Sequence, residues 1–320
     1  MLQQTTVGAV RGRYEAFLAR FPDVASLAAA TRESVLAEWS GLGYYARARN
    51  LHAAAEIVAR EHGGTLPSDP AVLRRLPGFG EYMSAAVPSL AYGVRAPAAD
   101  ANVERVVSRL FAIDGLAGSR AHRALVLGAT ERLLPDDRPG DLIAAFMDLG
   151  QTICTPRTPA CGICPLLSEC AGAATGDPAR FPKKPARPPI VRVSYAAADA
   201  RRGARILMVR RPPGWLGGLW ELPSAEGPNA TAARLALARR LRPIGLRLDL
   251  SAPRHFVSHT IVRRRLDVEI LQAVPSGRVG RNASRAPAAK WFRRDELEAA
   301  AIPTLTRKIA SAAGFLRAQL

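Results

Sequence analysis

The sequence predicts a mostly α-helical domain that ends in a four-cysteine metal loop, followed by a smaller α+β domain. Three observations support this prediction. The only four cysteines of the 320-residue chain lie between residues 154 and 170. Apolar residues recur at helical spacing before this loop, and strand-like runs follow it. With 48% hydrophobic residues, the chain is long enough to form two cored domains.

The first 170 residues contain short amphipathic helices. Two groups of apolar residues repeat at helical spacing, and Pro and Gly pairs separate such segments. The first group is Val7, Val10, Tyr14, Phe17 and Leu18, and the second is Val103, Val106, Val107, Leu110 and Phe111.

A change of composition marks the end of the helical domain. Residues 171–189 are rich in Pro, Gly and basic residues and lack an apolar period, which predicts a linker. Beyond them, strand-like runs at 191–195, 206–209 and 266–274 alternate with helical segments at 231–241 and 304–319. We therefore expect domains at 1–170 and 190–320, joined by a linker at 171–189.

The cysteines are spaced C-x6-C-x2-C-x5-C, as Cys154, Cys161, Cys164 and Cys170. The chain opens without the charged, apolar and small-residue series of an export signal, and in a reducing compartment clustered thiols bind metal rather than form disulfides. Zinc sites with four cysteines usually pair two short knuckles. A four-thiolate iron–sulfur cluster fits this spacing better, and zinc is the alternative.

The charge balance favours a polyanionic partner. The chain carries 45 Lys and Arg against 27 Asp and Glu, a formal net charge of +18, which attracts nucleic acid. A solvated basic surface in a protein from an Arg-rich, GC-rich genome is the alternative. No apolar stretch reaches 18 residues. We expect no membrane span and a cytoplasmic, nucleoid-associated protein.

Several segments together resemble a known family. The cysteine spacing is similar to the [4Fe-4S] loop of the endonuclease III and adenine glycosylase superfamily of DNA glycosylases. The segment Leu76-Pro77-Gly78-Phe79-Gly80 resembles the hairpin of a helix-hairpin-helix motif, and residues 41–51 resemble a segment of adenine glycosylases of the MutY family. Glycines let a backbone approach phosphate, and helix N-termini bind anions, so Gly78 and Gly80 are expected to contact DNA. An ordinary Pro-Gly turn between helices is the alternative.

Asp100 lies about 20 residues after the hairpin and precedes a helical run. Asp is a good N-cap, and an ionised carboxylate at a helix start can also stabilise a cationic sugar. The surrounding residues resemble the pattern D-G-N-V-x-R-V of the MutY family, with Ala101 in place of Gly. The resemblance implies that Asp100 is catalytic and that Asn102 positions it.

Tyr82 separates two kinds of family member. Endonuclease III-like lyases place a nucleophilic lysine at this position, and adenine-specific members have Tyr or Ser. Without an amine no Schiff base forms, so the resemblance implies hydrolysis without strand cleavage, with Tyr82 lining the site. Packing against the helix core is the other role for this residue.

The chain opens with a segment, Met1-Leu2-Gln3-Gln4-Thr5, that resembles one found in the family just after a catalytic Glu. That Glu lies two residues before the Met and acts as general acid. We therefore expect a start assigned at an internal Met or a fragment, and slow adenine release by the chain as written. A truncated protein that binds DNA without cleaving it is the alternative.

The resemblance also implies residues that contact the base opposite the target. Gln3, Gln4, Thr5, Leu42 and Tyr44 are expected to enter the duplex beside 8-oxoguanine, replacing stacking that is lost when adenine is flipped out. Core packing is the alternative for Leu42 and Tyr44.

The second domain resembles the Nudix-like domain of MutY proteins. The stretch from Arg210 to Pro223 is similar to R-P-x-x-G-L-x-x-G-L-W-E-F-P. No acidic residues follow Glu221 in the helical segment 231–241, so we expect lesion recognition without Nudix hydrolysis. Residues 255–259 resemble the family's H-x-F-S-H loop, with Val257 in place of Phe. Ser258 and His259 are expected to recognise 8-oxoguanine, and a surface or core histidine is the alternative for His259.

Together these resemblances imply an adenine glycosylase of base excision repair, built from a helix-hairpin-helix core and a Nudix-like domain. The expected cofactor is one [4Fe-4S] cluster that orders a basic loop. The expected partner is double-stranded DNA with adenine opposite 8-oxoguanine or guanine, bound by a monomer. A catalytically silent mismatch-binding protein and an endonuclease III-like glycosylase/lyase are the alternatives.

Overall fold

The computed structural model describes residues 1–186, 188–212, 217–275 and 289–317. The chain forms two compact units. Unit 1 combines Met1–Glu56 with Pro188–Leu320, and unit 2 is Ile57–Arg187. Neither boundary coincides with the predicted domain limits, which stay a prediction. Within the described residues, no helix is both long enough and apolar enough to cross a membrane.

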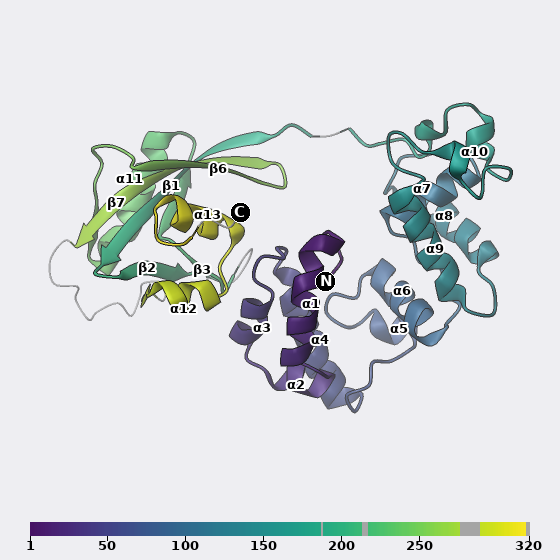
Figure 1. Cartoon of the computed structure of the whole chain (residues 1–320), viewed down its shortest axis with the longest axis horizontal. Helices are drawn as coiled ribbons and strands as arrows, with labels where there is room; N and C mark the ends of the chain where they lie inside the picture. Colours follow the sequence, from purple (N-terminus) through teal and green to yellow (C-terminus); the bar gives the residue numbers. More distant parts are fainter. Residues whose placement is uncertain (187, 213–216, 276–288, 318–320) are drawn as a thin grey trace. The chain divides into compact units, whose positions relative to one another are not determined.

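Unit 2 is helical (Figure 1). Val103, Val106 and Val107, which the sequence predicts to share a helix face, are all buried on one helix. They pack with Ile143 and Phe146 in a common core, so this helix prediction is confirmed. The main helices of the unit are α5 (Pro70–Leu73), α6 (Glu81–Tyr92), α7 (Ala101–Leu110), α8 (Arg120–Leu133), α9 (Pro139–Thr152) and α10 (Ala171–Ala174).

A tight turn joins α5 to α6 where the sequence predicts a hairpin. Gly78 has a φ of +84°, a conformation that glycine adopts without steric cost. The N–H of Phe79 bonds the carbonyl of Leu76. Gly80 is the N-cap of α6 and has no side chain, so no side-chain cap bonds the first N–H groups of that helix.

The N-terminal part of unit 1 consists of α1 (Val7–Arg20), α2 (Val24–Ala29), α3 (Arg32–Glu38) and most of α4 (Ala46–Glu61). The predicted first helix is confirmed, but only part of its apolar face is buried. Phe17 packs edge-on against Trp39, while Val7, Tyr14 and Leu18 are exposed. The helical period therefore predicts the element better than it predicts which apolar residues are buried.

The remainder of unit 1 contains a mixed sheet. Its central strands are β1 (Val191–Arg202) and β7 (Arg264–Pro275), which run parallel. The other strands are β2 (Arg205–Arg210), β3 (Trp220–Glu221), β4 (Ser224–Gly227), β5 (Leu246–Leu248), β6 (His255–Ile261) and β8 (Ala289–Phe292), and the order along the main path is β3-β2-β1-β7-β5. The strands predicted at 191–195, 206–209 and 266–274 are confirmed within longer ones.

Alternate residues of β1 belong to different cores, as strand geometry requires. Ala196 and Ala198 pack beneath α11 (Ala230–Leu241). Tyr195 and Ala197 lie in the opposite core with α12 (Arg294–Ala299) and α13 (Thr304–Ala312). Figure 1 shows these helices beside the sheet. Helices on both faces make this part an α+β layer structure.

The predicted linker at 171–189 begins with packed residues. Gly172 of α10 lies so close to α7 that a Cβ there would be 2.5 Å from the carbonyl oxygen of Arg109. Phe181 is buried, and Lys183 bonds the Asp114 carboxylate at 2.9 Å. The close backbone contact at Gly172 and the buried ring of Phe181 hold this stretch on unit 2. The Pro- and Gly-rich composition of the stretch does not predict these contacts.

Candidate active site and iron–sulfur loop

Asp100 caps α7 with its side chain. Oδ1 accepts from the backbone N–H groups of Asn102 and Val103, both at 2.8 Å. Oδ2 accepts from the Asn102 side-chain amide at 3.0 Å. A carboxylate has about four acceptor positions, so one position on Oδ2 remains. The start of α7 thus orients a half-buried carboxylate and leaves one acceptor position of Oδ2 available to another group.

Asn102 is itself held in one orientation by Arg105. Arg105 Nη2 donates to Asn102 Oδ1 at 2.9 Å, and because arginine has only donors, the amide nitrogen of Asn102 must face Asp100. Arg105 in turn donates to the carbonyl oxygens of Gly150 at 2.6 Å and Cys154 at 2.8 Å. The sequence pattern includes this arginine, but its link between Asn102 and the cysteine loop is found only in the structure.

Tyr82 follows the hairpin on the first turn of α6. Its hydroxyl lies 3.7 Å from the sulfur of Met147 on α9. Burial, aided by the negative charge of Asp100, raises the pKa of Tyr82 to about 12. Tyr82 is therefore a neutral phenol at ordinary pH, electrostatically coupled to Asp100. Its ring also packs against the core of unit 2, so the packing role and the site role are compatible.

The four cysteines surround one small cavity. Cys154, Cys161, Cys164 and Cys170 all line it, together with Arg109 and Ile153, and none is in a disulfide. Burial and the three neighbouring thiols raise the pKa of Cys161. Within the described residues, no three His, Cys, Asp or Glu side chains are placed to hold a single metal ion. Four thiols that line one cavity and are spaced C-x6-C-x2-C-x5-C fit an iron–sulfur cluster better than zinc.

Arg109 holds the start of this cysteine loop through hydrogen bonds. Its guanidinium is buried and donates to the carbonyl oxygens of Thr155 at 2.8 Å and Phe181 at 3.1 Å. The same group lies 3.3 Å from Cys154 Sγ. Hydrogen bonds and positive charge at a ligand sulfur stabilise a thiolate-bound cluster. Sequence reasoning did not identify Arg109, whose helical position predicts only a surface or core residue.

The N-terminal segment is held by another arginine. Arg47 donates to the Met1 carbonyl at 2.7 Å and to the Thr5 hydroxyl at 2.8 Å. It also lies over the rings of Trp39 and Tyr44, at 5.3 and 5.4 Å from the ring centres. Arg47 thus brings the first five residues together with the loop 41–44, two segments that the sequence assigns to one role.

The residues expected to enter the duplex differ in exposure. Gln3, Gln4 and Tyr44 are exposed, and Thr5 is half-buried. Leu42 is 5% exposed and packs in the core of unit 1. Core packing accounts for Leu42 in this structure, whereas the other side chains are accessible to a partner. Contact with DNA stays a prediction for all five residues.

Ser258 and His259 are neighbours on β6 and therefore face opposite sides of the sheet. Ser258 is exposed and lies 3.5 Å from an Asp267 oxygen. His259 is half-buried, and burial with the charge of Lys308 lowers its pKa.

In the stretch from Arg210 to Pro223, residues 213–216 lie outside the described residues, and Glu221 pairs with Arg211 at 3.0 Å. Burial raises the pKa of Glu221.

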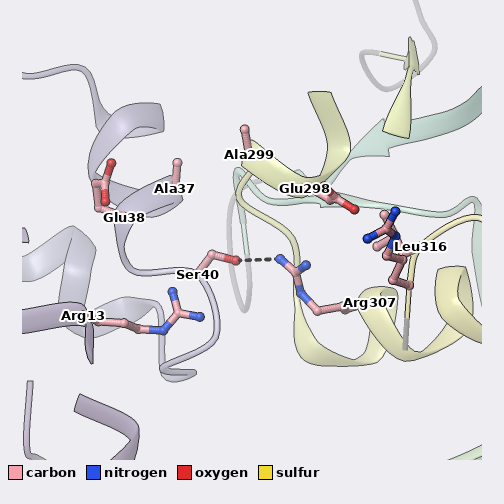
Figure 2. Close-up of a pocket in the computed structure, with 9 residues that line it drawn as sticks. Arg13, Ala37, Glu38, Ser40, Glu298, Ala299, Arg307 and Leu316 are labelled. Atoms are coloured by element: carbon pink, nitrogen blue, oxygen red, sulfur yellow. Dashed lines mark hydrogen bonds between the residues drawn. The ribbon is translucent and has the colours of Figure 1, made fainter. Parts of the chain in front are cut away.

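A separate cavity of about 450 Å³ lies within unit 1. Figure 2 shows residues that line it, among which Arg307 donates to the Ser40 hydroxyl at 3.5 Å. None of its lining residues is a predicted site residue. They are Arg13, Ala37, Glu38, Ser40, Glu298, Ala299, Arg307, Leu316 and Arg317.

Comparison with family models matches three parts of the chain. Residues 1–128 match the HhH-GPD superfamily of base excision DNA repair proteins. Residues 154–170 match the iron-sulfur binding domain of endonuclease III, and residues 196–312 match a NUDIX domain. The predicted fold class and the predicted [4Fe-4S] loop are confirmed by these matches.

Comparison with curated proteins gives relatives along almost the whole chain. The adenine DNA glycosylase of Homo sapiens is 32% identical over 359 residues, covering 97% of this chain and 66% of the relative. That of Rattus norvegicus is 31% identical, covering 97% and 69%. That of Mycobacterium tuberculosis is 38% identical over 217 residues, covering 66% and 67%. The chain thus spans about two thirds of the length of these relatives.

Proposed function

The chain belongs to the adenine DNA glycosylase family, and we propose that it hydrolyses the N-glycosidic bond of adenine in DNA. The proposed substrate is a duplex in which adenine lies opposite 8-oxoguanine or guanine, and the proposed pathway is base excision repair. The observation that carries this proposal is the Asp100 carboxylate, held by three hydrogen bonds at the start of α7 with one oxygen position left open.

In the proposed reaction Asp100 serves the sugar. As the bond between C1′ and the base nitrogen breaks, positive charge develops on the sugar ring, and a fixed carboxylate stabilises it. Asn102 keeps the carboxylate in place because Arg105 holds its amide. Water then adds to C1′, one proton is lost from this water and one is taken up by the departing adenine nitrogen, and an abasic site and free adenine remain.

Tyr82 supports hydrolysis over the lyase reaction. A lyase requires an amine nucleophile that forms a Schiff base with the sugar, and a phenol with a pKa of about 12 provides neither amine nor phenolate at neutral pH. The polar hydroxyl next to Asp100 fits a role in shaping the site. We therefore propose that the enzyme is monofunctional and leaves the strand intact.

The [4Fe-4S] cluster has a structural role in this proposal. Cys154, Cys161, Cys164 and Cys170 would hold it, and when bound it supplies a rigid, electron-rich core to the loop 154–170. Because Arg105 bonds the Cys154 carbonyl and Asn102, and Asn102 bonds Asp100, order in the loop reaches the catalytic carboxylate through two side chains.

The test is base release from defined duplexes. We expect the protein to release adenine placed opposite 8-oxoguanine or guanine and to leave adenine opposite thymine untouched. The product strand should break only after alkali or heat treatment, as an abasic site does. Strand cleavage without treatment, trapped by borohydride as a covalent adduct, would instead identify a lyase.

A further inference from the structure

An aromatic side chain projects from a part of the sheet that its covering helix leaves open. In the register of β6 with β7, Phe256 lies opposite Glu269, Ser258 opposite Asp267 and Thr260 opposite Arg265. Residues that face each other across antiparallel strands share one side of the sheet. Phe256 is 71% exposed, and Ser258 and Thr260 are exposed beside it.

The register fixes this exposure. Val257 and Ile261 point to the other side of β6 and pack against the core that contains Leu266 and Val268. A one-residue change of register would bury Phe256 and expose the whole apolar row. The outward position of the phenyl ring is therefore a property of the strand, and the fold gains no burial from it.

Helix α11 covers only the neighbouring part of the same side. It packs on Ala196, Ala198 and Leu271, and its Arg234 forms a two-pronged ion pair with Glu269 at 2.7 and 3.0 Å. The acid opposite Phe256 is thus neutralised from the helix. The open surface begins at Phe256 and extends toward the turn between β6 and β7.

The open surface ends in a group of arginines. Arg192 of β1 is in register with Arg265 of β7, and both are exposed. Arg265 lies 3.5 Å from Asp267. Arg264 pairs with Glu226 at 2.7 Å. Arg264 and Glu226 lie on the other side of the sheet, the side of Leu266 and Tyr195, and do not belong to this surface. Together with Arg263 in the turn, Arg192 and Arg265 lie near one acid, Asp267, so the surface carries a surplus of positive charge that complements phosphate.

We propose that this open sheet face, made of Phe256, Ser258, Thr260, Arg192 and Arg265, binds an unstacked base of DNA. Phe256 stacks on the base, the hydroxyls contact its edge and the arginines neutralise the adjacent phosphates. Exposed aromatic residues on a sheet beside cations bind single-stranded nucleic acid in this way. The proposal rests on the proposed function. It assigns base contact to alternate residues on one side of β6, Phe256, Ser258 and Thr260, instead of to the adjacent pair Ser258 and His259.

The test compares Phe256→Ala and Phe256→Tyr in the full chain. Binding is measured by fluorescence anisotropy with two probes, a single-stranded oligonucleotide and a duplex carrying 8-oxoguanine opposite a non-cleavable adenine analogue. Loss of one base–aromatic stack is expected to weaken binding about 5- to 100-fold in the Ala variant, and the Tyr variant should bind like the wild type. Leu235→Ala, a similarly exposed position on α11, is the matched control and should change nothing.

The two probes distinguish the source of the base. Weaker binding to both means that the face accepts any unstacked base, and weaker binding to the mispaired duplex alone means that it accepts the base opposite adenine. Either result supports the face. Arg192→Gln combined with Arg265→Gln should lower the slope of log affinity against log salt by about two, while Phe256→Ala leaves it unchanged.

Unchanged affinity of Phe256→Ala for both probes would overturn the proposal. The outcome is separable from the proposed function, because these measurements need no base release. A wild-type protein that binds the mispaired duplex but never releases adenine would remove the proposed function, and the Phe256 comparison would still decide whether the open sheet face binds a base.

Discussion

Replacing Gly150 by Ala tests how strictly α9 controls the position of Asp100, the proposed catalytic carboxylate. Gly150 lies under the first turn of α7, and a Cβ there would be 2.7 Å from Asn102 Cβ and 3.1 Å from its Cα. Carbon atoms in contact are normally about 3.5–4.0 Å apart. The two helices must therefore separate by roughly 1 Å, which moves Asn102 and, with it, Asp100.

The magnitude follows from two opposing terms. Overpacking of a dense core costs about 1–3 kcal/mol, and replacing Gly by Ala within a helix returns about 1 kcal/mol. We expect Gly150→Ala to lower the free energy of unfolding by about 0–2 kcal/mol. A displacement of about 1 Å at a catalytic group can cost about 10²-fold in rate, so adenine release should fall much more than stability.

The assays are urea unfolding and single-turnover adenine release from an 8-oxoguanine:adenine duplex. Gly128→Ala is the matched control, since Gly128 is also in a helix and a Cβ there would meet only the end of the Arg132 side chain, at 4.0 Å. This control should be slightly more stable and equally active. If Gly150→Ala behaved like Gly128→Ala in both assays, the contact between α9 and Asn102 would not control the site.

Three further predictions concern other groups. Arg105→Lys should slow adenine release by tenfold or more in single-turnover assays, because leaving a buried polar group without its partner costs about 1–3 kcal/mol. The phenolate absorbance of Tyr82, measured as the difference between wild type and Tyr82→Phe, should appear near pH 12 rather than near pH 10. The contribution of the neutral phenol to the free energy of unfolding is complete below about pH 10 and falls as the pH rises from about 10 to about 12. Because the pKa of His259 is lowered on folding, the unfolded state protonates first; stability should fall as pH drops below about 6.5, and His259→Gln should flatten this dependence in urea titrations at several pH values.

Local patterns predict the elements well. The Val103, Val106 and Val107 period predicts α7, and Asp100 at its start predicts the N-cap that the structure contains. The Pro-Gly turn predicts the junction before α6. These features depend on neighbouring residues only, so the sequence contains the necessary information.

Contacts between distant segments are harder to predict. Arg105 and Arg109 bond backbone carbonyls about 45 residues away, and a carbonyl acceptor leaves no trace in the residue types. Leu42 and Tyr44 are both large hydrophobic residues of the loop 41–44, but only Tyr44 is exposed in the structure. The opposite orientation of Ser258 and His259, by contrast, follows from strand periodicity once the strand is recognised.

Asp100→Asn is the most direct test of the proposed function. The substitution preserves the shape of the side chain and the oxygen that accepts from the backbone N–H groups of Asn102 and Val103. It replaces the oxygen that accepts from the Asn102 amide by an NH2 group, and it removes the charge that stabilises the sugar cation. We predict that single-turnover release of adenine from an 8-oxoguanine:adenine duplex falls by about 10²-fold or more, while affinity for the same duplex is kept or increased, because a negative charge near phosphate is lost. Release by Asp100→Asn at the wild-type rate would contradict the assignment of Asp100 as the catalytic carboxylate.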